Sequence, residues 1–153
     1  MLFLIFQIGN DRYALDTSQV AVVLPPAPCK QVPDAPAWVR GIFSYDGRNV
    51  PVLDVSMLAL GTPAAAWLST RLVLTHYTPA GQVPQLLGLI VEKATDTLRC
   101  EAGDFNDSGL LHENARYLGP VMRHGGELVQ WVKVAAILDD AVQALLFPQE
   151  SLA

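Results

Sequence analysis

The chain is a succession of short apolar runs, rich in β-branched and aromatic side chains and separated by turn-forming residues. Runs of this length and composition are typical of β-strands. The pattern therefore predicts a mostly-β protein. The expected strands cover residues 2–8, 13–15, 20–24, 39–45, 49–55, 71–77, 86–92, 97–100, 117–123 and 127–132.

Only the C-terminal segment has a clear helical period. Its apolar residues recur at the spacing of one face of an α-helix, and Pro148 ends the pattern. The spacing predicts one helix over residues 134–147, with Asp139 and Asp140 on its exposed face. The residues of the stripe are Val134, Ile137, Leu138, Ala141, Val142, Leu145 and Leu146.

The stretch from Pro33 to Asp54 has the most distinctive local signals. Asp46-Gly47 lies between two apolar runs and favours a tight hairpin turn, because both residue types tolerate a positive φ. Gly41 permits a second backbone segment to approach closely. Pro51 has no N–H to donate, which predicts that its strand lies at a sheet edge or at a bulge.

Charge and hydropathy argue against several classes of partner. The net charge is −5 and no basic run exceeds two residues, so nucleic acid and anionic membrane surfaces are not expected partners. No apolar run approaches the roughly 18 residues that span a bilayer. Because the apolar N-terminus turns polar at Asn10 without a basic start, we expect a cytoplasmic protein with Cys29 and Cys100 as free thiols.

No arrangement of residues indicates catalysis. The histidines His76, His112 and His124 have no metal-ligand spacing, no serine lies in a nucleophile-elbow context, and no Gly-rich phosphate loop is present. A polar loop over 101–116 carries several carboxylates and could hold a hard cation, but a solvated loop explains it better. We therefore expect no enzyme, no cofactor and no metal. The carboxylates of this loop are Glu101, Asp104, Asp107 and Glu113.

Taken as a whole, the Pro33–Asp54 stretch resembles the signature of the CheW-like family, the scaffold adaptors of bacterial chemosensory arrays. That signature reads approximately Pro-x-x-Pro-x-aromatic-hydrophobic-x-Gly-hydrophobic-x-Asn-x-Arg-Gly, followed by Pro-hydrophobic-hydrophobic-Asp after three further residues. The matching positions are Pro33, Pro36, Trp38, Gly41, Gly47, Pro51 and Asp54. Weaker similarities cover residues 3–16, 20–24, 88–92, 117–119 and 128–129 and the C-terminal helix.

The resemblance implies two intertwined five-stranded SH3-like barrels that share one core, with a C-terminal α-helix. It implies a single domain over 1–153, with a first lobe at about 14–66 and a second at about 70–132. The N-terminal strands would cross between the lobes, and helix 134–147 would follow. The implied function is non-enzymatic. Such an adaptor joins the cytoplasmic tip of a chemoreceptor to the regulatory domain of a histidine kinase, and reaches membrane receptor arrays only through these partners.

Carried over by position, the resemblance also implies a receptor-binding set, whereas the kinase contacts are not assigned. On this basis Gly41→Arg and Gly47→Val are both expected to abolish receptor binding, the first with the fold mostly intact and the second with a strained fold. The implied receptor-binding residues are Val20, Val22, Gly41, Ser44, Tyr45, Asp46, Gly47 and Arg48.

One departure from the family pattern bears on the choice of receptor. Where the family usually has Asn-x-Arg-Gly, this chain has Ser44-Tyr45-Asp46-Gly47, and Arg48 follows. An arginine binds carboxylates that Asp46 would repel. Either Arg48 substitutes from a shifted position, or the receptor differs. We favour a dedicated adaptor of an alternative pathway, such as surface sensing or twitching.

A second hypothesis comes from a different class of protein. The chain could be a stand-alone β-barrel that binds a small ligand in a pocket between its lobes. A saturable, stoichiometric thermal shift with a small molecule would favour this reading, whereas co-purification with a kinase fragment would favour the adaptor.

Overall fold

The computed structural model describes residues 1–110 and 113–149. Residues 111–112, which include His112 of the polar loop, and residues 150–153 at the end of the expected domain lie outside the described part. Nine strands occur in the described residues: β1 (Leu2–Ile8), β2 (Asp11–Asp16), β3 (Val20–Leu24), β4 (Val39–Tyr45), β5 (Arg48–Asp54), β6 (Arg71–Tyr77), β7 (Gln85–Arg99), β8 (Leu118–His124) and β9 (Glu127–Val132). The helical elements are α1 (Val55–Leu60), α2 (Asp140–Leu146) and the single-turn 3₁₀ helices η1 (Thr17–Gln19), η2 (Ala102–Asp104) and η3 (Val134–Ala136).

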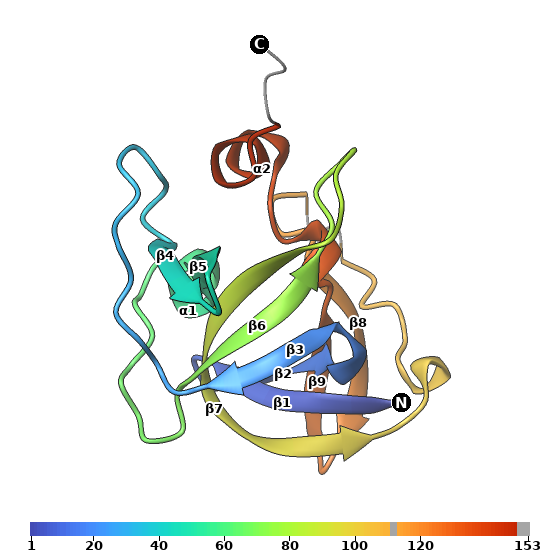
Figure 1. Cartoon of the computed structure of the whole chain (residues 1–153). Coiled ribbons are helices and arrows are strands. Elements are labelled where there is room, and N and C mark those ends of the chain that lie inside the picture. Colours follow the sequence, from blue (N-terminus) through green and yellow to red (C-terminus); the bar gives the residue numbers. More distant parts are fainter. Residues whose placement is uncertain (111–112, 150–153) are drawn as a thin grey trace.

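The mostly-β prediction is confirmed, and one long strand organises it. Strand β7 has 15 residues and curves across the molecule (Figure 1). Its first half pairs antiparallel with β6 and parallel with β5, and its second half pairs antiparallel with β1. Lobe one therefore has the strand order β3-β6-β7-β5-β4, and lobe two has the order β7-β1-β2-β9-β8.

Each lobe is a curled five-stranded sheet that backbone pairing does not close. Within the residues that the structure describes, no ladder joins β3 to β4 or β7 to β8. A single bridge crosses each opening instead, Lys30 with Ile42 in lobe one and Asn106 with Val121 in lobe two. The two free strands of lobe one, β3 and β4, are therefore edges that a partner could approach.

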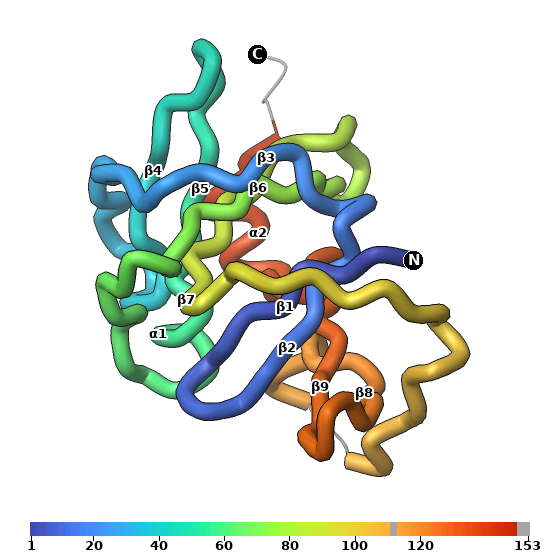
Figure 2. The backbone as a smooth tube through the Cα atoms, turned by 90° about the horizontal axis from the view of Figure 1, so that it is seen from below, coloured from blue at the N-terminus to red at the C-terminus, as the bar shows by residue number. Residues whose placement is uncertain are grey.

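The strand pairing corrects the expected division into lobes at about 14–66 and 70–132. Strand β2 lies parallel to the C-terminal strand β9, and β1 pairs with β2 and with the second half of β7. Strand β6 belongs with β3 and β5 in lobe one. The reason is that parallel pairs join segments far apart in the sequence, so contiguous halves of the chain are not the structural units (Figure 2).

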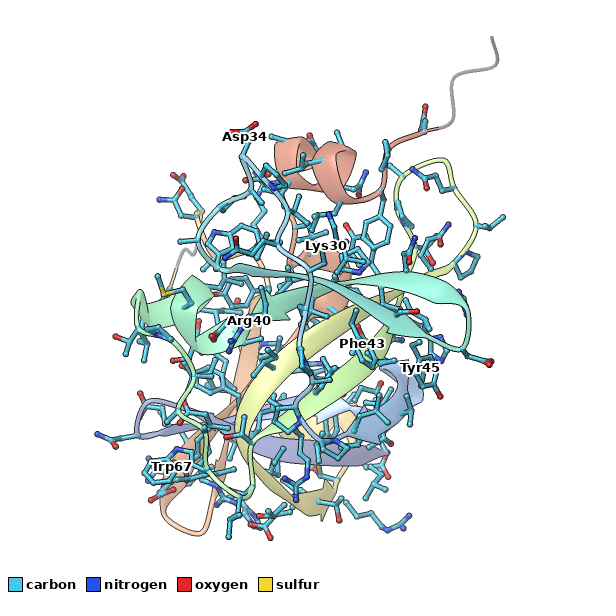
Figure 3. The ribbon with its side chains drawn as sticks, turned by 60° about the vertical axis from the view of Figure 1, so that its left-hand side comes forward. Lys30, Asp34, Arg40, Phe43, Tyr45 and Trp67 are labelled. Atoms are coloured by element: carbon cyan, nitrogen blue, oxygen red, sulfur yellow. The ribbon has the colours of Figure 1, made fainter. Side chains whose placement is uncertain are left out.

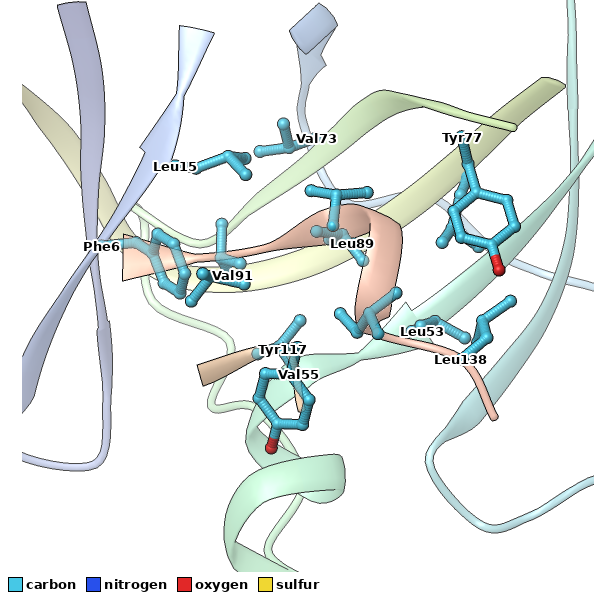
Figure 4. Packing of buried hydrophobic residues seen from close by; sticks show 14 of the residues in the cluster. Phe6, Leu15, Leu53, Val55, Val73, Tyr77, Leu89, Val91, Tyr117 and Leu138 are labelled. Carbon is cyan, nitrogen blue, oxygen red and sulfur yellow. The ribbon is translucent and has the colours of Figure 1, made fainter. Parts of the chain in front are cut away.

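Both faces of the central strands are buried, which explains why their sequences are continuously apolar and do not alternate. In β7, Leu87 and Leu89 face a central cluster between the lobes, whereas Leu86 and Ile90 face the interior of lobe one. The central cluster draws on all parts of the chain (Figure 4). A third cluster, built around Phe3, fills lobe two.

The C-terminal helix is shorter than predicted. The segment over 134–147 is divided into η3 and, after a break, α2. The break occurs because Asp139 is the N-cap of α2, where its carboxylate accepts a hydrogen bond from Val142 N at 2.8 Å. Asp139 therefore starts the helix as its N-cap, and both Asp139 and Asp140 are exposed as predicted. None of the described helices is long and apolar enough to cross a membrane.

Truncating the central cluster should destabilise both lobes together. Leu89 is fully buried on β7, so Leu89→Ala is expected to lower the free energy of unfolding by about 2–5 kcal/mol. Leu128→Ala is a matched control, because that side chain is 57% exposed and its loss should cost below about 0.5 kcal/mol. Urea denaturation measures both values, and equal effects would contradict the assigned core.

Candidate functional site

The hairpin of β4 and β5 forms around the predicted Asp46-Gly47 turn. Both residues have a positive φ, +49° for Asp46 and +75° for Gly47, as a two-residue type I′ turn requires. Tyr45 pairs with Arg48 across the turn. Asp46 thus occupies a left-handed position that aspartate adopts readily, which gives it a conformational role in the turn.

Gly41 is buried beneath the segment that follows β3. Its φ is +142°, and a Cβ at this position would lie 2.8 Å from the carbonyl carbon of Lys30 and 3.1 Å from the Cβ of Cys29. The space is closed by the bridge between Lys30 and Ile42, whose two hydrogen bonds measure 2.9 Å and 2.7 Å. The expected close backbone approach at Gly41 is confirmed, but the expectation that Gly41→Arg leaves the fold mostly intact is wrong.

Pro51 does not place its strand at an edge. Strand β5 lies between β4 and β7. Pro51 is tolerated because the pairing with β7 begins only at Val52. The residue opposite Pro51 is Ile42, whose backbone N–H and C=O both form hydrogen bonds with Lys30. Ile42 therefore needs no N–H donor from Pro51.

Asp54 is the polar anchor at the base of the hairpin, and it is only 4% exposed. Its carboxylate caps α1 by accepting from Met57 N at 3.1 Å. The same carboxylate accepts from Ala64 N at 3.2 Å and 3.0 Å, and Arg40 lies 3.5 Å away. One side chain thus holds the start of α1 and the loop that follows it.

The helix α1 was not expected from the sequence, although both of its ends are marked there. Asp54 is a favoured N-cap residue, and Gly61 ends the helix in a left-handed conformation with φ +73°. With only six residues between these signals, the apolar run had no room to show a helical period.

The two implied residues on β3 point to different sides of the sheet. Val20 packs against the central cluster, whereas Val22 packs against the interior of lobe one. A register shift between them explains this, since Val20 pairs with Thr75 and Val22 with the adjacent Leu74. The irregularity at Ala21 reverses the normal alternation.

Half-buried apolar side chains gather along the opening of lobe one, between β3 and the β4–β5 hairpin, and we call them the lobe-one seam. Phe43 and Tyr45 are stacked with ring centroids 6.4 Å apart, and Figure 3 shows both on the hairpin. Of the implied receptor-binding residues, the seam brings together Val22 and Tyr45. Its full membership is Val22, Leu24, Ala27, Cys29, Phe43 and Tyr45.

Four more of the implied residues lie at the hairpin tip, beside the seam, whereas Val20 and Gly41 lie outside both the seam and the tip. Ser44, Asp46, Gly47 and Arg48 are all exposed. Because Arg48 pairs directly with Tyr45, its side chain leaves the hairpin on the face of Tyr45 and the seam. The tip thus presents a guanidinium at the rim of an apolar surface.

Phe43 is a seam residue that does not belong to the implied receptor-binding set. Its signal was the two-residue period of a strand, which puts it on the same face as Tyr45. Leu24, Ala27 and Cys29 gave no such signal, because they join the seam through the irregular segment after β3. Burial raises the pKa of the Cys29 thiol, and Arg40 partly opposes this, so the thiol is protonated at neutral pH.

The other sequence motifs do not form a site in the described residues. In the polar loop, Asp104 accepts a hydrogen bond from Glu101 N and Asp107 accepts one from Gly109 N, each at 2.9 Å. These carboxylates therefore stabilise backbone turns. No group of three or more potential metal ligands occurs within residues 1–110 and 113–149. Both cysteines are free thiols, as expected.

The buried glycine should be far less tolerant of substitution than the exposed one. Gly41→Ala is expected to lower the free energy of unfolding by clearly more than Gly47→Ala, because it adds a clash with the Lys30 backbone to the strain of a positive φ. Gly47 has nothing within 4 Å of an added Cβ, so its substitution carries only the conformational strain, about 1–2 kcal/mol. Denaturant midpoints measure the difference, and equal losses would refute the close approach.

The chain is similar in sequence to known proteins of one family. A family model described as the CheW-like domain matches residues 2–142. The chain is 23% identical over 137 residues to chemotaxis protein CheW of Helicobacter pylori, covering 89% of this chain and 80% of that protein. It is 28% identical over 94 residues to chemotaxis protein CheW of Rhizobium meliloti, covering 61% of this chain and 57% of that protein.

A solved structure has the same fold. The scaffolding protein TtCheW from Thermoanaerobacter tengcongensis superimposes with a TM-score of 0.78, and the match covers 90% of this chain and 87% of that one. The sequence identity is 16%, so this likeness bears on the fold alone.

Proposed function

The chain belongs to the CheW-like domain family, and from that premise we propose that it is a non-enzymatic scaffold adaptor of a bacterial chemosensory array. The names of its relatives, chemotaxis protein and scaffolding protein, support this assignment. The observation that carries it is the lobe-one seam, an apolar surface with a charged rim at the open side of the lobe-one sheet.

The first partner is the cytoplasmic tip of a chemoreceptor, a helical hairpin. An amphipathic helix binds by laying its apolar face in a groove, and the seam offers apolar side chains on both sides of an opening. Val22 lies on one side, and Phe43 and Tyr45 lie on the other. Gly41 contributes indirectly in this proposal, because its close packing fixes the hairpin over the opening.

Arg48 takes the role of the arginine that the family motif has two positions earlier. Asp46 and Gly47 are both needed for the tight turn, and the cation is therefore shifted to the first paired position after it. From there Arg48 shares a face with Tyr45 and can reach a carboxylate on the receptor helix. Asp46 at the tip repels carboxylates, which narrows the range of receptors that fit.

The second partner is the regulatory domain of a histidine kinase. Docking both partners raises their effective concentration and lets the state of the receptor bias the state of the kinase. Simultaneous docking requires that the kinase contact a surface other than the lobe-one seam. A change confined to the hairpin tip should therefore separate the two activities.

Removing the cation at the rim tests this assignment. Arg48→Ala is expected to weaken binding to the cytoplasmic hairpin of the receptor encoded in the same operon by roughly tenfold, because a charge-assisted contact is lost. Arg123→Ala is a matched control, since Arg123 is also an exposed arginine and lies on β8 in lobe two. Titration calorimetry measures both affinities.

The same variant should still capture the kinase regulatory domain in a pull-down, which shows that it is folded. Unchanged receptor affinity in Arg48→Ala would remove the seam from the receptor site. Loss of both partners at once would instead indicate a single shared surface.

The shifted arginine also supports a dedicated pathway, such as surface sensing or twitching, over general chemotaxis. We expect the chain to bind the receptor of its own operon at least tenfold more tightly than receptors encoded elsewhere in the same genome, a difference of about 1.4 kcal/mol. Equal affinities across several ordinary chemotaxis receptors would rule out this specialisation.

A further inference from the structure

A second recess lies between the lobes, away from the lobe-one seam. It has a volume of about 750 Å³, within the usual range for a small-molecule site. Trp38 and Tyr77 come from lobe one, and Tyr117 directly precedes β8. Residues 135–140 and Gln143 form another wall. We call it the interlobe cleft.

The interlobe cleft is acidic. Glu113, Asp139 and Asp140 line it, against the single guanidinium of Arg116. One oxygen of Asp139 caps α2, and Asp140 makes no ion pair within the described residues. Carboxylates beside aromatic faces are the chemistry that binds organic cations, because the ring faces and the carboxylates both attract positive charge.

A buried tyrosine is a second, independent indication that the cleft is a binding site. Tyr117 is only 4% exposed, lines the cleft, and makes no side-chain hydrogen bond within the part of the chain that the structure describes. Leaving such a group unpaired is costly, so a partner that enters the cleft and pairs with it would be stabilised.

Tyr77 is a second tyrosine that lines the interlobe cleft. Its hydroxyl donates to Gln143 Oε1 at 3.0 Å, which leaves the lone pairs of its own oxygen as acceptors. Figure 4 shows the hydroxyl groups of Tyr77 and Tyr117 pointing toward the same side of the view. Burial raises the pKa of both groups, so both are protonated and neutral at neutral pH.

We propose that the interlobe cleft is a binding site for an organic cation, an amine or guanidinium group carried on an apolar or aromatic skeleton. The cation would lie against Trp38 and donate a hydrogen bond to the Tyr117 hydroxyl oxygen, with Asp140 balancing its charge. The ligand is either a free metabolite or a basic side chain of a docked protein, and both supply the same chemistry. This site goes beyond the adaptor function and does not depend on it.

The test uses the full chain and three small probes. The probes are 2-phenylethylamine, its neutral counterpart 2-phenylethanol, and N-acetylarginine amide as a model of a protein side chain. Titration is followed by NMR through the indole N–H resonances of the three tryptophans. Trp38 should shift with the amine, whereas Trp67 should not, since it lies at a different place on the surface (Figure 3).

Two variants locate the cation. Tyr117→Phe keeps the ring in the core and should weaken binding of the amine roughly tenfold. Asp140→Asn should weaken it about threefold, because this carboxylate is exposed. Asp96→Asn, which changes an exposed carboxylate on β7 outside the cleft, is the matched control and should leave binding unchanged. If Tyr117→Phe is unfolded, Asp140→Asn still decides the question.

Each outcome bears on the proposal. Tighter binding of the amine indicates a free metabolite, and tighter binding of the arginine amide indicates a docked side chain. Equal binding of 2-phenylethanol, unchanged affinity in both variants, or no shift of Trp38 with either cation would overturn it. Because no receptor or kinase is present, failure here leaves the adaptor proposal unaffected, and failure of the receptor titration leaves this one unaffected.

Discussion

The whole structure depends on one strand that belongs to both lobes. Strand β7 pairs with β6 and β5 in its first half and with β1 in its second. Its side chains fill the central cluster on one face and the lobe-one interior on the other. Gly88 lets β7 lie close to its neighbours, because a Cβ there would stand 3.0 Å from Leu72 and Val52 side-chain atoms. The lobes cannot separate without breaking this strand's pairing.

This shared strand also determines where the proposed docking surface lies. The parallel pairing of β5 with β7 ends at Asp54, whose carboxylate then holds α1 and the following loop. The hairpin is thus anchored at its base, and its tip extends beyond the sheet beside the edge strand β3. The apolar side chains of the lobe-one seam are only half-buried because the sheet stays open there. Arg48 reaches the rim of the seam because a two-residue turn places it opposite Tyr45.

The bounds of strands and turns were predicted correctly where the local sequence contained a single clear secondary-structure signal. The strands at residues 2–8, 20–24, 39–45, 71–77 and 127–132 were predicted with their observed bounds, and so was the Asp46-Gly47 turn. The prediction was wrong where two signals competed. An apolar stripe suggested one helix over 134–147, but Asp139 caps a new helix inside it. The short α1 was missed because six residues are too few to show a period.

The sequence by itself determined the mostly-β class, the tight hairpin turn and the resemblance to the CheW-like family, because these depend on local composition and spacing. Only the tertiary structure decided which strands form each lobe, that Val20 and Val22 face opposite sides, and that Gly41 is buried. The interlobe cleft also exists only in the tertiary structure, because Trp38 and Tyr117, which both line it, come from distant parts of the chain. The physical reason is that parallel pairing, bulges and closure between lobes join residues whose separation in sequence carries no periodic signal.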